Sequence, residues 1–313
     1  MTRALVIGFG SAGQRHARLL GEFGLETAIV SRRESAHPNV FPAIDAAIDR
    51  FAPDYVVVAN ETTAHRVALG ALQQARFARL LLVEKPLWSS REKPLAAAMP
   101  QLYVGYNLRF HPAIRALRMA LQNRQVLSAE IYCGSWLPDW RPGRDYRKTS
   151  SALTASGGGA LHDLSHELDY ANWLFGPWRR VSALGGHLSK LTIETDDVAM
   201  ILAEMAGCPA LSISLNYVER RPRRGMIVNT GEDTLSLDIE AGTLTSARNG
   251  AIAVAPFVLD DTYRDQHRAI LEGSTADLCD YEHGLGIVDM MAAVEKSIED
   301  ASWVVSKNSG EIA

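Results

Sequence analysis

Near its N-terminus the chain reads Ala4-Leu5-Val6-Ile7-Gly8-Phe9-Gly10-Ser11-Ala12-Gly13. The apolar run predicts a buried strand, and the glycines predict a turn. The helical spacing of apolar residues after the turn predicts a helix. In a G-x-G-x-x-G turn the first glycine permits the tight bend. The second lets a pyrophosphate approach the backbone, and the third lets the helix pack closely on the strand. The phosphates lie beside the N-terminus of the helix. We therefore expect dinucleotide binding at Gly8, Gly10, Ser11, Ala12 and Gly13.

The end of the second predicted strand, residues 27–30, bears on the choice between NAD and NADP. An acidic residue about 20 residues after the glycines would bind the 2′-hydroxyl of NAD. This chain has Ser31, Arg32 and Arg33 there. A hydroxyl and two guanidinium groups suit a 2′-phosphate. The sequence therefore favours NADP as the cofactor.

Strands and helices continue to alternate up to about residue 104. The apolar runs at 55–59 and 80–83 are nearly continuous, as in parallel strands covered by helices on both faces. Polar residues follow the carboxyl ends of these strands, where α/β sheets bind ligands. We expect four of them beside the cofactor: Asn60, Thr62, Glu84 and Lys85. Lys85, which precedes a proline, is also placed to donate a charged hydrogen bond to a substrate.

A second glycine run, Gly157-Gly158-Gly159, precedes a segment rich in titratable side chains. If a helix continues from there through residue 174, residues three or four apart share a face, so Asp163, His166 and Glu167 project together. The glycines would leave the backbone N–H groups at the N-terminus of this helix free to face a ligand oxygen. The segment is a candidate acid–base cluster.

From about residue 125 the apolar pattern changes to strict alternation, as at 211–217 and 235–239. Strands of this kind bury one face and indicate an antiparallel sheet with helices on one side. A length of 313 residues suits two domains. We predict an α/β chain in which residues 1–122 form a Rossmann doubly wound parallel sheet that binds NADP(H). Residues 123–313 would form an α+β domain with an open, mainly antiparallel sheet for substrate binding and oligomerisation.

Two stretches are rich in arginine: the first basic segment, residues 141–148, and the second basic segment, residues 220–224. One interpretation is a solvated loop and a charged hairpin end. The other is that one segment binds a phosphate or carboxylate on the substrate.

Four motifs in this order resemble the glucose–fructose oxidoreductase/inositol dehydrogenase/MocA (Gfo/Idh/MocA) family: residues 8–13, Glu84-Lys85-Pro86, residues 105–110 and the glycine-run helix. The resemblance covers essentially the whole chain. It implies the two domains described above, with the C-terminal sheet used for dimer or tetramer contacts. It also implies NAD(P)-dependent alcohol or ketone chemistry on sugars or related polyols. Residues 165–170 resemble a subgroup of sugar oxidoreductases from surface-polysaccharide pathways.

By the same resemblance, Lys85 would touch the reacting oxygen and the nicotinamide ribose, with Asp163 and His166 across from it. We expect His166 to act as general acid/base, Asp163 to assist and Lys85 to polarise the developing alkoxide. Asp163 and His166 are three residues apart, where many family members have four, and Glu167 occupies the fourth position. We expect substrate contacts from five residues: Asn107, Arg109, Tyr146, Arg147 and Glu167.

Composition argues against several other classes of protein. The formal net charge of −4 gives no basic footprint for nucleic acid, and no arm or apolar run of about 18 residues suggests a membrane. Three cysteines without C-x-x-C spacing suit reduced thiols in the cytoplasm better than disulfides or a zinc site. We therefore expect no metal, no nucleic acid and no membrane partner.

Three other functions compete with a dehydrogenase. His162 and His166 flank Asp163 with a spacing similar to the H-E-x-x-H of zinc peptidases. A metallohydrolase would use Asp in place of Glu, would lack an evident third ligand and would leave the glycine turn without a role. The other two are a cofactor-binding redox sensor without turnover and a redox-assisted glycoside hydrolase. Against the sensor, Lys85, Asp163 and His166 are side chains that sensing does not need.

Overall fold

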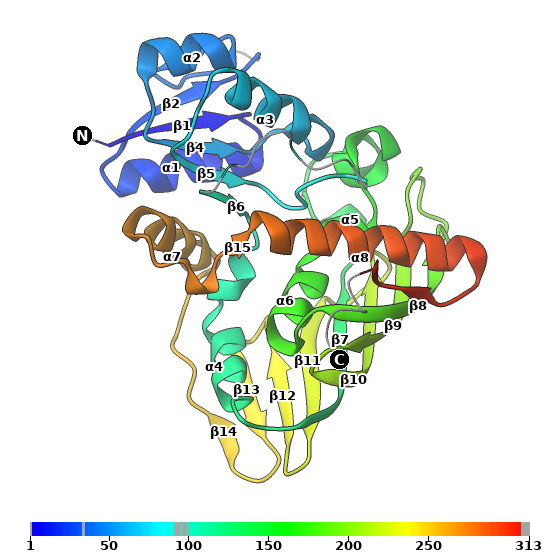
Figure 1. Cartoon of the computed structure of the whole chain (residues 1–313). Coiled ribbons are helices and arrows are strands. Elements are labelled where there is room, and N and C mark those ends of the chain that lie inside the picture. The colour runs from blue at the N-terminus through cyan, green and yellow to red at the C-terminus, as the bar shows by residue number, and fades with distance from the viewer. Residues whose placement is uncertain (1, 33–34, 91–94, 96–98, 100, 308–313) are drawn as a thin grey trace. The chain divides into compact units, whose positions relative to one another are not determined.

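The computed structural model describes residues 2–32, 35–90, 95, 99 and 101–307, and it contains two sheets in two compact units (Figure 1). The first unit comprises Met1–Asn107 and Leu259–Leu285, and the second comprises Leu108–Val258 and Gly286–Ala313. Among the described residues, no helix has the length and apolar character needed to cross a bilayer.

The sheet of the first unit has seven strands in the order β15-β6-β5-β4-β1-β2-β3. All neighbours are parallel except β15 and β6. The strands are β1 (Arg3–Ile7), β2 (Glu26–Val30), β3 (Val40–Phe41), β4 (Tyr55–Val58), β5 (Leu80–Val83), β6 (Leu102–Val104) and β15 (Cys279–Asp280). Because β1 lies between β2 and β4, the strand order reverses there, and α/β sheets bind ligands beside such a point.

Helices cover the parallel sheet of the first unit. They are α1 (Ser11–Glu22), α2 (Ile44–Phe51), η1 (Thr62–Ala64), α3 (His65–Gln74), α7 (Leu259–Glu272) and η7 (Thr275–Asp277). Helix α1 buries its Leu19 and Leu20 side, and the four residues of β4 are fully buried. Each fully buried Leu or Val stabilises the fold by roughly 1.5–3 kcal/mol, which explains the continuous apolar runs.

Helix α7 follows the second unit in sequence yet belongs to the first. It contacts α1, and its His267 is completely buried there. The compact units therefore differ from the expected single division between residues 122 and 123. Helical periodicity could not show this difference, because an amphipathic helix does not reveal which sheet it covers.

The sheet of the second unit has nine strands in the order β14-β13-β12-β11-β7-β10-β9-β8-β16. Neighbours are antiparallel apart from β7 and β10. The strands are β7 (Val126–Gly134), β8 (Trp178–Gly186), β9 (Val198–Met205), β10 (Cys208–Asn216), β11 (Arg223–Thr230), β12 (Thr234–Asp238), β13 (Thr243–Ser246), β14 (Gly250–Ile252) and β16 (Val304–Val305). The predicted fold class, a parallel sheet followed by a mainly antiparallel one, is confirmed.

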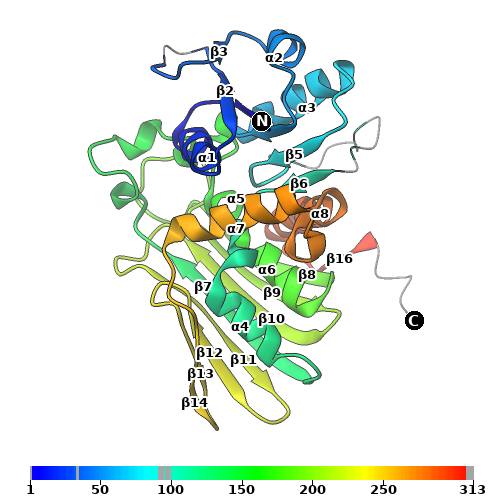
Figure 2. The same cartoon turned by 90° about the vertical axis from the view of Figure 1, so that its left-hand side faces the viewer.

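Helices lie on one face of this second sheet (Figure 2). They include α4 (Pro112–Ala120), α5 (Ala160–Asp163), α6 (His166–Phe175) and α8 (Tyr281–Asp300), while short 3-10 turns fall at η2 (Asn107–Phe110), η3 (Leu137–Asp139), η4 (Tyr146–Lys148), η5 (Ser150–Ala152) and η6 (Thr154–Ser156). Residues of β8 and β9 that alternate with the core are exposed, among them Leu184, Met200 and Leu202. The sheet therefore has one covered face and one open face, as the alternating pattern predicts.

Candidate active site

The glycine turn after β1 has the geometry that its three glycines predict. Gly8 has φ of +94°, and a Cβ there would lie 2.6 Å from the Asn60 backbone at the end of β4. A Cβ on Gly13 would lie 2.0 Å from the carbonyl oxygen of Gly8, so helix α1 can pack this closely only with glycine. A Cβ on Gly10, in contrast, would meet no atom within 4 Å. Gly8 and Gly13 thus shape the turn, and Gly10 leaves open space beside it.

The N-terminus of α1 faces this turn, and no described residue caps it with a side chain. Gly10 occupies the N-cap position and supplies no side-chain hydrogen bond, and the first turn contains no acidic residue. Helix N-termini with such donors attract phosphate groups. Open space at Gly10 next to these donors fits the pyrophosphate of a dinucleotide.

The residues expected beside the cofactor after β2 and β4 differ in exposure. Ser31 is half-buried and Arg32 is exposed. Arg33 lies outside the described residues. Thr62 is half-buried in η1, and the Asn60 amide donates to the Ala64 carbonyl at 3.4 Å.

Lys85 is half-buried, and the residue before it anchors its backbone at the end of β5. One oxygen of the Glu84 carboxylate accepts the Lys85 backbone N–H at 3.1 Å, and the other contacts His16 Nε2 at 2.8 Å. Burial would raise the pKa of the Glu84 carboxyl, but His16 and Lys85 outweigh it and lower that pKa. Glu84 is therefore ionised at neutral pH.

A buried chain of hydrogen bonds continues behind Glu84. His16 Nδ1 lies 2.9 Å from His267 Nε2, and His267 Nδ1 lies 2.9 Å from the Tyr55 hydroxyl. Burial, together with the neighbouring His16, holds the pKa of His267 well below its ordinary value, so His267 is neutral. Three elements, α1, α7 and β4, thus hold the carboxylate next to Lys85.

In the second unit, the predicted continuous helix after the glycine run is divided into α5 and α6, with a break at Leu164 and Ser165. The expectation of a bare N-terminus is wrong. The Asp196 carboxylate accepts the Leu161 N–H at 2.9 Å, and the Asp196 carbonyl accepts the Ala160 N–H at 3.0 Å. A Cβ on Gly159 would lie 2.0 Å from an Asp196 carboxylate oxygen, so this glycine makes room for a protein cap.

Asp163, the last residue of α5, is half-buried and accepts a 2.7 Å hydrogen bond from the Tyr217 hydroxyl. Burial and the Asp163 charge raise the pKa of Tyr217 well above its ordinary value, so the phenol remains a donor. The Tyr217 ring packs edge-on against Trp140, with 5.1 Å between ring centroids. These contacts fix the orientation of the Asp163 carboxylate.

His166 begins α6 and is half-buried, whereas His162 is buried in α5. His162 Nε2 lies 3.1 Å from Glu295 of α8. Burial lowers the pKa of His162, but Glu295 and nearby acids outweigh it and leave that pKa raised. The helix break between the two histidines removes the regular i, i+4 geometry of a zinc-peptidase helix, and the described residues contain no cluster of three metal-ligating side chains.

Three residues expected to contact substrate are instead buried and bonded within the protein: Asn107, Arg109 and Glu167. Glu167 pairs with Arg224 at 2.7 and 3.0 Å and also accepts from the Tyr170 hydroxyl. Arg109 pairs with Asp169 at 2.7 Å, and the Asn107 amide donates to Thr262 at 2.6 Å. These partners hold all three side chains in place within the protein, and their contact with a substrate stays a prediction.

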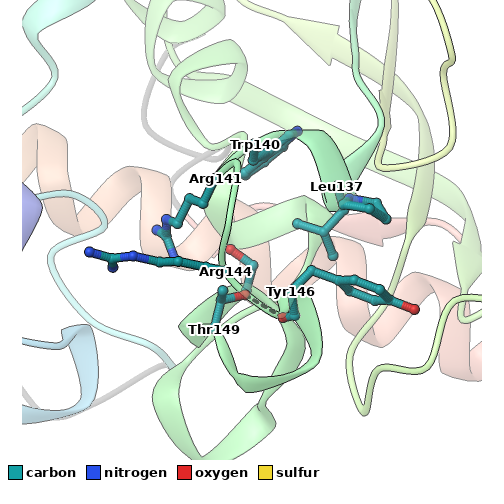
Figure 3. A pocket seen from close by; sticks show the side chains of 8 residues that line it. Leu137, Trp140, Arg141, Arg144, Tyr146 and Thr149 are labelled. Carbon is teal, nitrogen blue, oxygen red and sulfur yellow. Dashed lines mark hydrogen bonds between the residues drawn. The ribbon is translucent and has the colours of Figure 1, made fainter.

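The two remaining predicted substrate residues lie in the first basic segment. Tyr146 lines a small hollow (Figure 3), where its side chain is drawn. Its hydroxyl accepts the Thr192 N–H at 3.2 Å. Arg147 is exposed and makes two hydrogen bonds to Asp145, at 2.8 and 2.9 Å. The structure places Tyr146 at a surface that could meet a ligand and Arg147 in a local ion pair.

Sequence reasoning missed several residues that shape these sites: His16, His267, Asp196 and Tyr217. A signal existed for His16, because it shares the buried side of α1 with Leu19 and Leu20. A histidine on an apolar helix face needs a buried partner. The partners of the other three depend on tertiary pairing, which no local pattern shows.

The comparisons with known proteins agree with this architecture. Residues 125–245 match the model of the GFO/IDH/MocA C-terminal domain. Inositol 2-dehydrogenase of Rhizobium meliloti (strain 1021) is 24% identical over 253 residues, which cover 74% of this chain and 73% of that protein.

Two solved structures have a similar fold over nearly their whole length. UDP-N-acetylglucosamine 3-dehydrogenase from Acidithiobacillus ferrooxidans has a TM-score of 0.78 at 21% identity, covering 95% of this chain and 98% of that one. Levoglucosan dehydrogenase in complex with NADH and levoglucosan has a TM-score of 0.81 at 16% identity, covering 98% and 99%. At such identities the likeness shows a common fold.

Proposed function

We propose that the chain is an NAD(P)-dependent dehydrogenase or reductase of the Gfo/Idh/MocA family of oxidoreductases. Its substrate would be a secondary alcohol or ketone of a sugar, nucleotide sugar or polyol. A bound nicotinamide would accept or donate the hydride. The observation that carries the proposal is the glycine turn, where Gly10 is open beside an uncapped α1 and the turn follows the central strand β1.

The residues of this chain would bind the substrate and move its proton. Lys85 would donate a hydrogen bond to the reacting oxygen and stabilise the developing alkoxide. The anchoring of its backbone by Glu84 supports this role, because a donor contributes most when it is held in place before the reaction. His166 would take or return the hydroxyl proton, and Asp163, oriented by Tyr217, would assist.

Between the two nicotinamide cofactors we propose NADP(H), because the hydroxyl of Ser31 and the guanidinium groups of Arg32 and Arg33 suit a 2′-phosphate. Titration of the protein with NADPH and NADH tests it, with tighter binding of NADPH expected. Equal affinity for the two would remove the role given to these residues. Replacing Arg32 by Gln should weaken NADPH binding and leave NADH binding unchanged, because only NADPH carries the 2′-phosphate.

A screen of free sugars, nucleotide sugars, inositols and sugar acids with both cofactors, read at nicotinamide absorbance, tests the activity. Turnover of at least one compound is expected. The variants Lys85→Ala and His166→Ala should lose this turnover and still bind the cofactor. Near-normal rates in both variants would contradict the residue roles. Binding without turnover of any compound would favour a redox sensor, and glycoside cleavage without net change in cofactor would favour a redox-assisted hydrolase.

We further propose that the chain forms a homodimer or homotetramer through the open face of the nine-stranded sheet. The exposed apolar residues Leu184, Met200 and Leu202 support it, at 75%, 56% and 56% exposure on the paired strands β8 and β9. A cluster of this kind is a common mark of a protein interface. Light scattering should give a mass of two or four chains, and Leu184→Lys should lower it.

A further inference from the structure

The second unit contains a hollow formed by a single stretch of chain between β7 and α5. The hollow is shallow and open to solvent, and it is lined by Leu137, Pro138, Trp140, Arg141, Arg144, Tyr146, Thr149 and Ser151. The lining combines an indole and apolar side chains with two guanidinium groups (Figure 3). Such a mixture of apolar surface and a few polar groups is typical of small-molecule sites.

The two arginines of the hollow have no partner in the part of the chain that the structure describes. Neither Arg141 nor Arg144 has a side-chain hydrogen bond or an ion pair among those residues, whereas Arg147, three positions further on, is paired with Asp145. In Figure 3 the side chains of Arg141 and Arg144 extend toward the same side of the loop. Two cations with no counter-charge repel each other, and an anion between them would turn that repulsion into charge-assisted hydrogen bonds.

The hollow also adjoins the residue that holds Asp163. Trp140 of its lining packs against the Tyr217 ring, and Ser151 of its lining forms a side-chain hydrogen bond with Tyr217. Tyr217 in turn donates to Asp163. The hollow is therefore one side chain away from a proposed proton-transfer residue.

We propose that this hollow binds an anionic group of the substrate, a phosphate or a carboxylate, through Arg141 and Arg144. The inference rests on the proposed function and narrows it from sugars in general to sugars that carry such a group. Trp140 and Leu137 supply an apolar wall beside the anion, and the guanidinium groups select charged over neutral substrates.

Calorimetric titration tests the inference with five probes: inorganic phosphate, glucose 1-phosphate, glucuronate, uridine diphosphate and neutral glucose. At least one anionic probe is expected to bind ten times more tightly than glucose. The double variant Arg141→Gln/Arg144→Gln is expected to lose about tenfold or more of that affinity, because each charged hydrogen bond contributes substantially to binding. Tighter binding of glucose 1-phosphate than glucuronate identifies a phosphate, the reverse order a carboxylate, and preference for uridine diphosphate a nucleotide.

Arg221→Gln is the matched control, because Arg221 is exposed, lies outside the hollow and makes no side-chain bond in the described part of the chain. It should leave the affinity unchanged, and melting temperatures should show that all variants are folded. Equal binding of glucose and the anions, or equal losses in the double variant and in Arg221→Gln, would overturn the inference.

Failure of the proposed function looks different from failure of this inference. If no sugar is turned over but anion binding still depends on Arg141 and Arg144, the site stands and the activity is wrong. If a neutral sugar is turned over with the same KM in wild type and double variant, and the anions do not bind, the activity stands and the site is wrong.

Discussion

The two basic segments look alike in sequence and differ in what the fold does with them. In the second segment, the half-buried Arg224 pairs with the fully buried Glu167, and Arg220 lies over the Trp136 ring at 3.4 Å. In the first segment, Arg141 and Arg144 line a hollow with no partner among the described residues. Residues 223–224 lie on strand β11, where alternation turns every second side chain toward the core and α6. Arg141 and Arg144 lie in the loop before η4, so no strand alternation turns their side chains inward.

The difference shows that arginine density alone does not identify a binding surface. A charged residue on a strand next to a buried carboxylate stabilises the fold, and a charged residue on a loop without a carboxylate remains available to a ligand. Four predictions test whether the second basic segment stabilises the fold while the first does not.

The largest effect is expected from Arg224→Ala, which leaves Glu167 buried without its cation. Removal of one partner of a buried pair costs about 3–5 kcal/mol of unfolding free energy. Denaturant unfolding measures it. The double variant Arg224→Met/Glu167→Leu should lose less than the single one, because no unpaired charge remains, and a loss below about 1 kcal/mol in Arg224→Ala would contradict the burial of this pair.

The second effect is a pH dependence at His111, which is buried near Arg224. Burial, and then the nearby Arg224 charge, lower the pKa of His111 to about 4. The Nδ1 atom of His111 also accepts the Ala113 N–H at the start of α4, which requires an unprotonated ring nitrogen. Between its unfolded pKa of about 6.5 and its folded pKa, the unfolded chain binds a proton that the folded chain does not.

The free energy of unfolding should therefore be highest above about pH 6.5. It should fall by roughly 3 kcal/mol as the pH is lowered to the folded pKa of His111. Unfolding curves measured across this range check the sign. His111→Asn keeps a helix cap without a titrating ring, so its curve should be flatter. A slope that is unchanged in this variant would show that His111 is not the group responsible.

A smaller effect is expected from Arg220→Gln, which removes the guanidinium from the Trp136 ring. Such contacts at exposed sites contribute about 0.5–1 kcal/mol. Thermal unfolding and the near-ultraviolet signal of the indole should both change slightly. An unaltered indole signal would indicate that the contact is not populated in solution.

No measurable effect is expected from Arg147→Gln, although Arg147 is ion-paired with Asp145 in the first segment. Exposed pairs gain little, because solvent screens them. The melting temperature should match that of the wild type. A clear loss of stability would show that the first segment also supports the fold, and the contrast between the segments would weaken.

Much of the fold and part of the site followed from sequence. Apolar continuity at 55–58 and alternation at 211–217 distinguish the two sheets, and the roles of Gly8 and Gly13 follow from backbone sterics. Glu167, expected to contact substrate, illustrates the limit. Its spacing from Asp163 predicts a shared face on one continuous helix, whereas the helix breaks at Leu164 and Ser165. Spacing also does not show that Arg224, 57 positions away, neutralises it.

The glycine run at 157–159 teaches the same lesson. Bare glycines before a helix are compatible with a ligand or with a close approach of the protein itself, and here Asp196 occupies the space. The return of α7 to the first unit, with His267 behind Glu84, is likewise a property of tertiary pairing. Local pattern fixes which element forms, and long-range contact decides which polar groups remain available.

The central claim is that this chain transfers a hydride between a nicotinamide and a carbinol carbon, with Lys85 at the reacting oxygen. The most direct measurement uses the substrate found in the screen, deuterated at the carbon that is oxidised, with mass analysis of the reduced cofactor. The account predicts deuterium in the nicotinamide product with wild type and no product with Lys85→Ala. Turnover without deuterium in the cofactor, or undiminished transfer in Lys85→Ala, would contradict it.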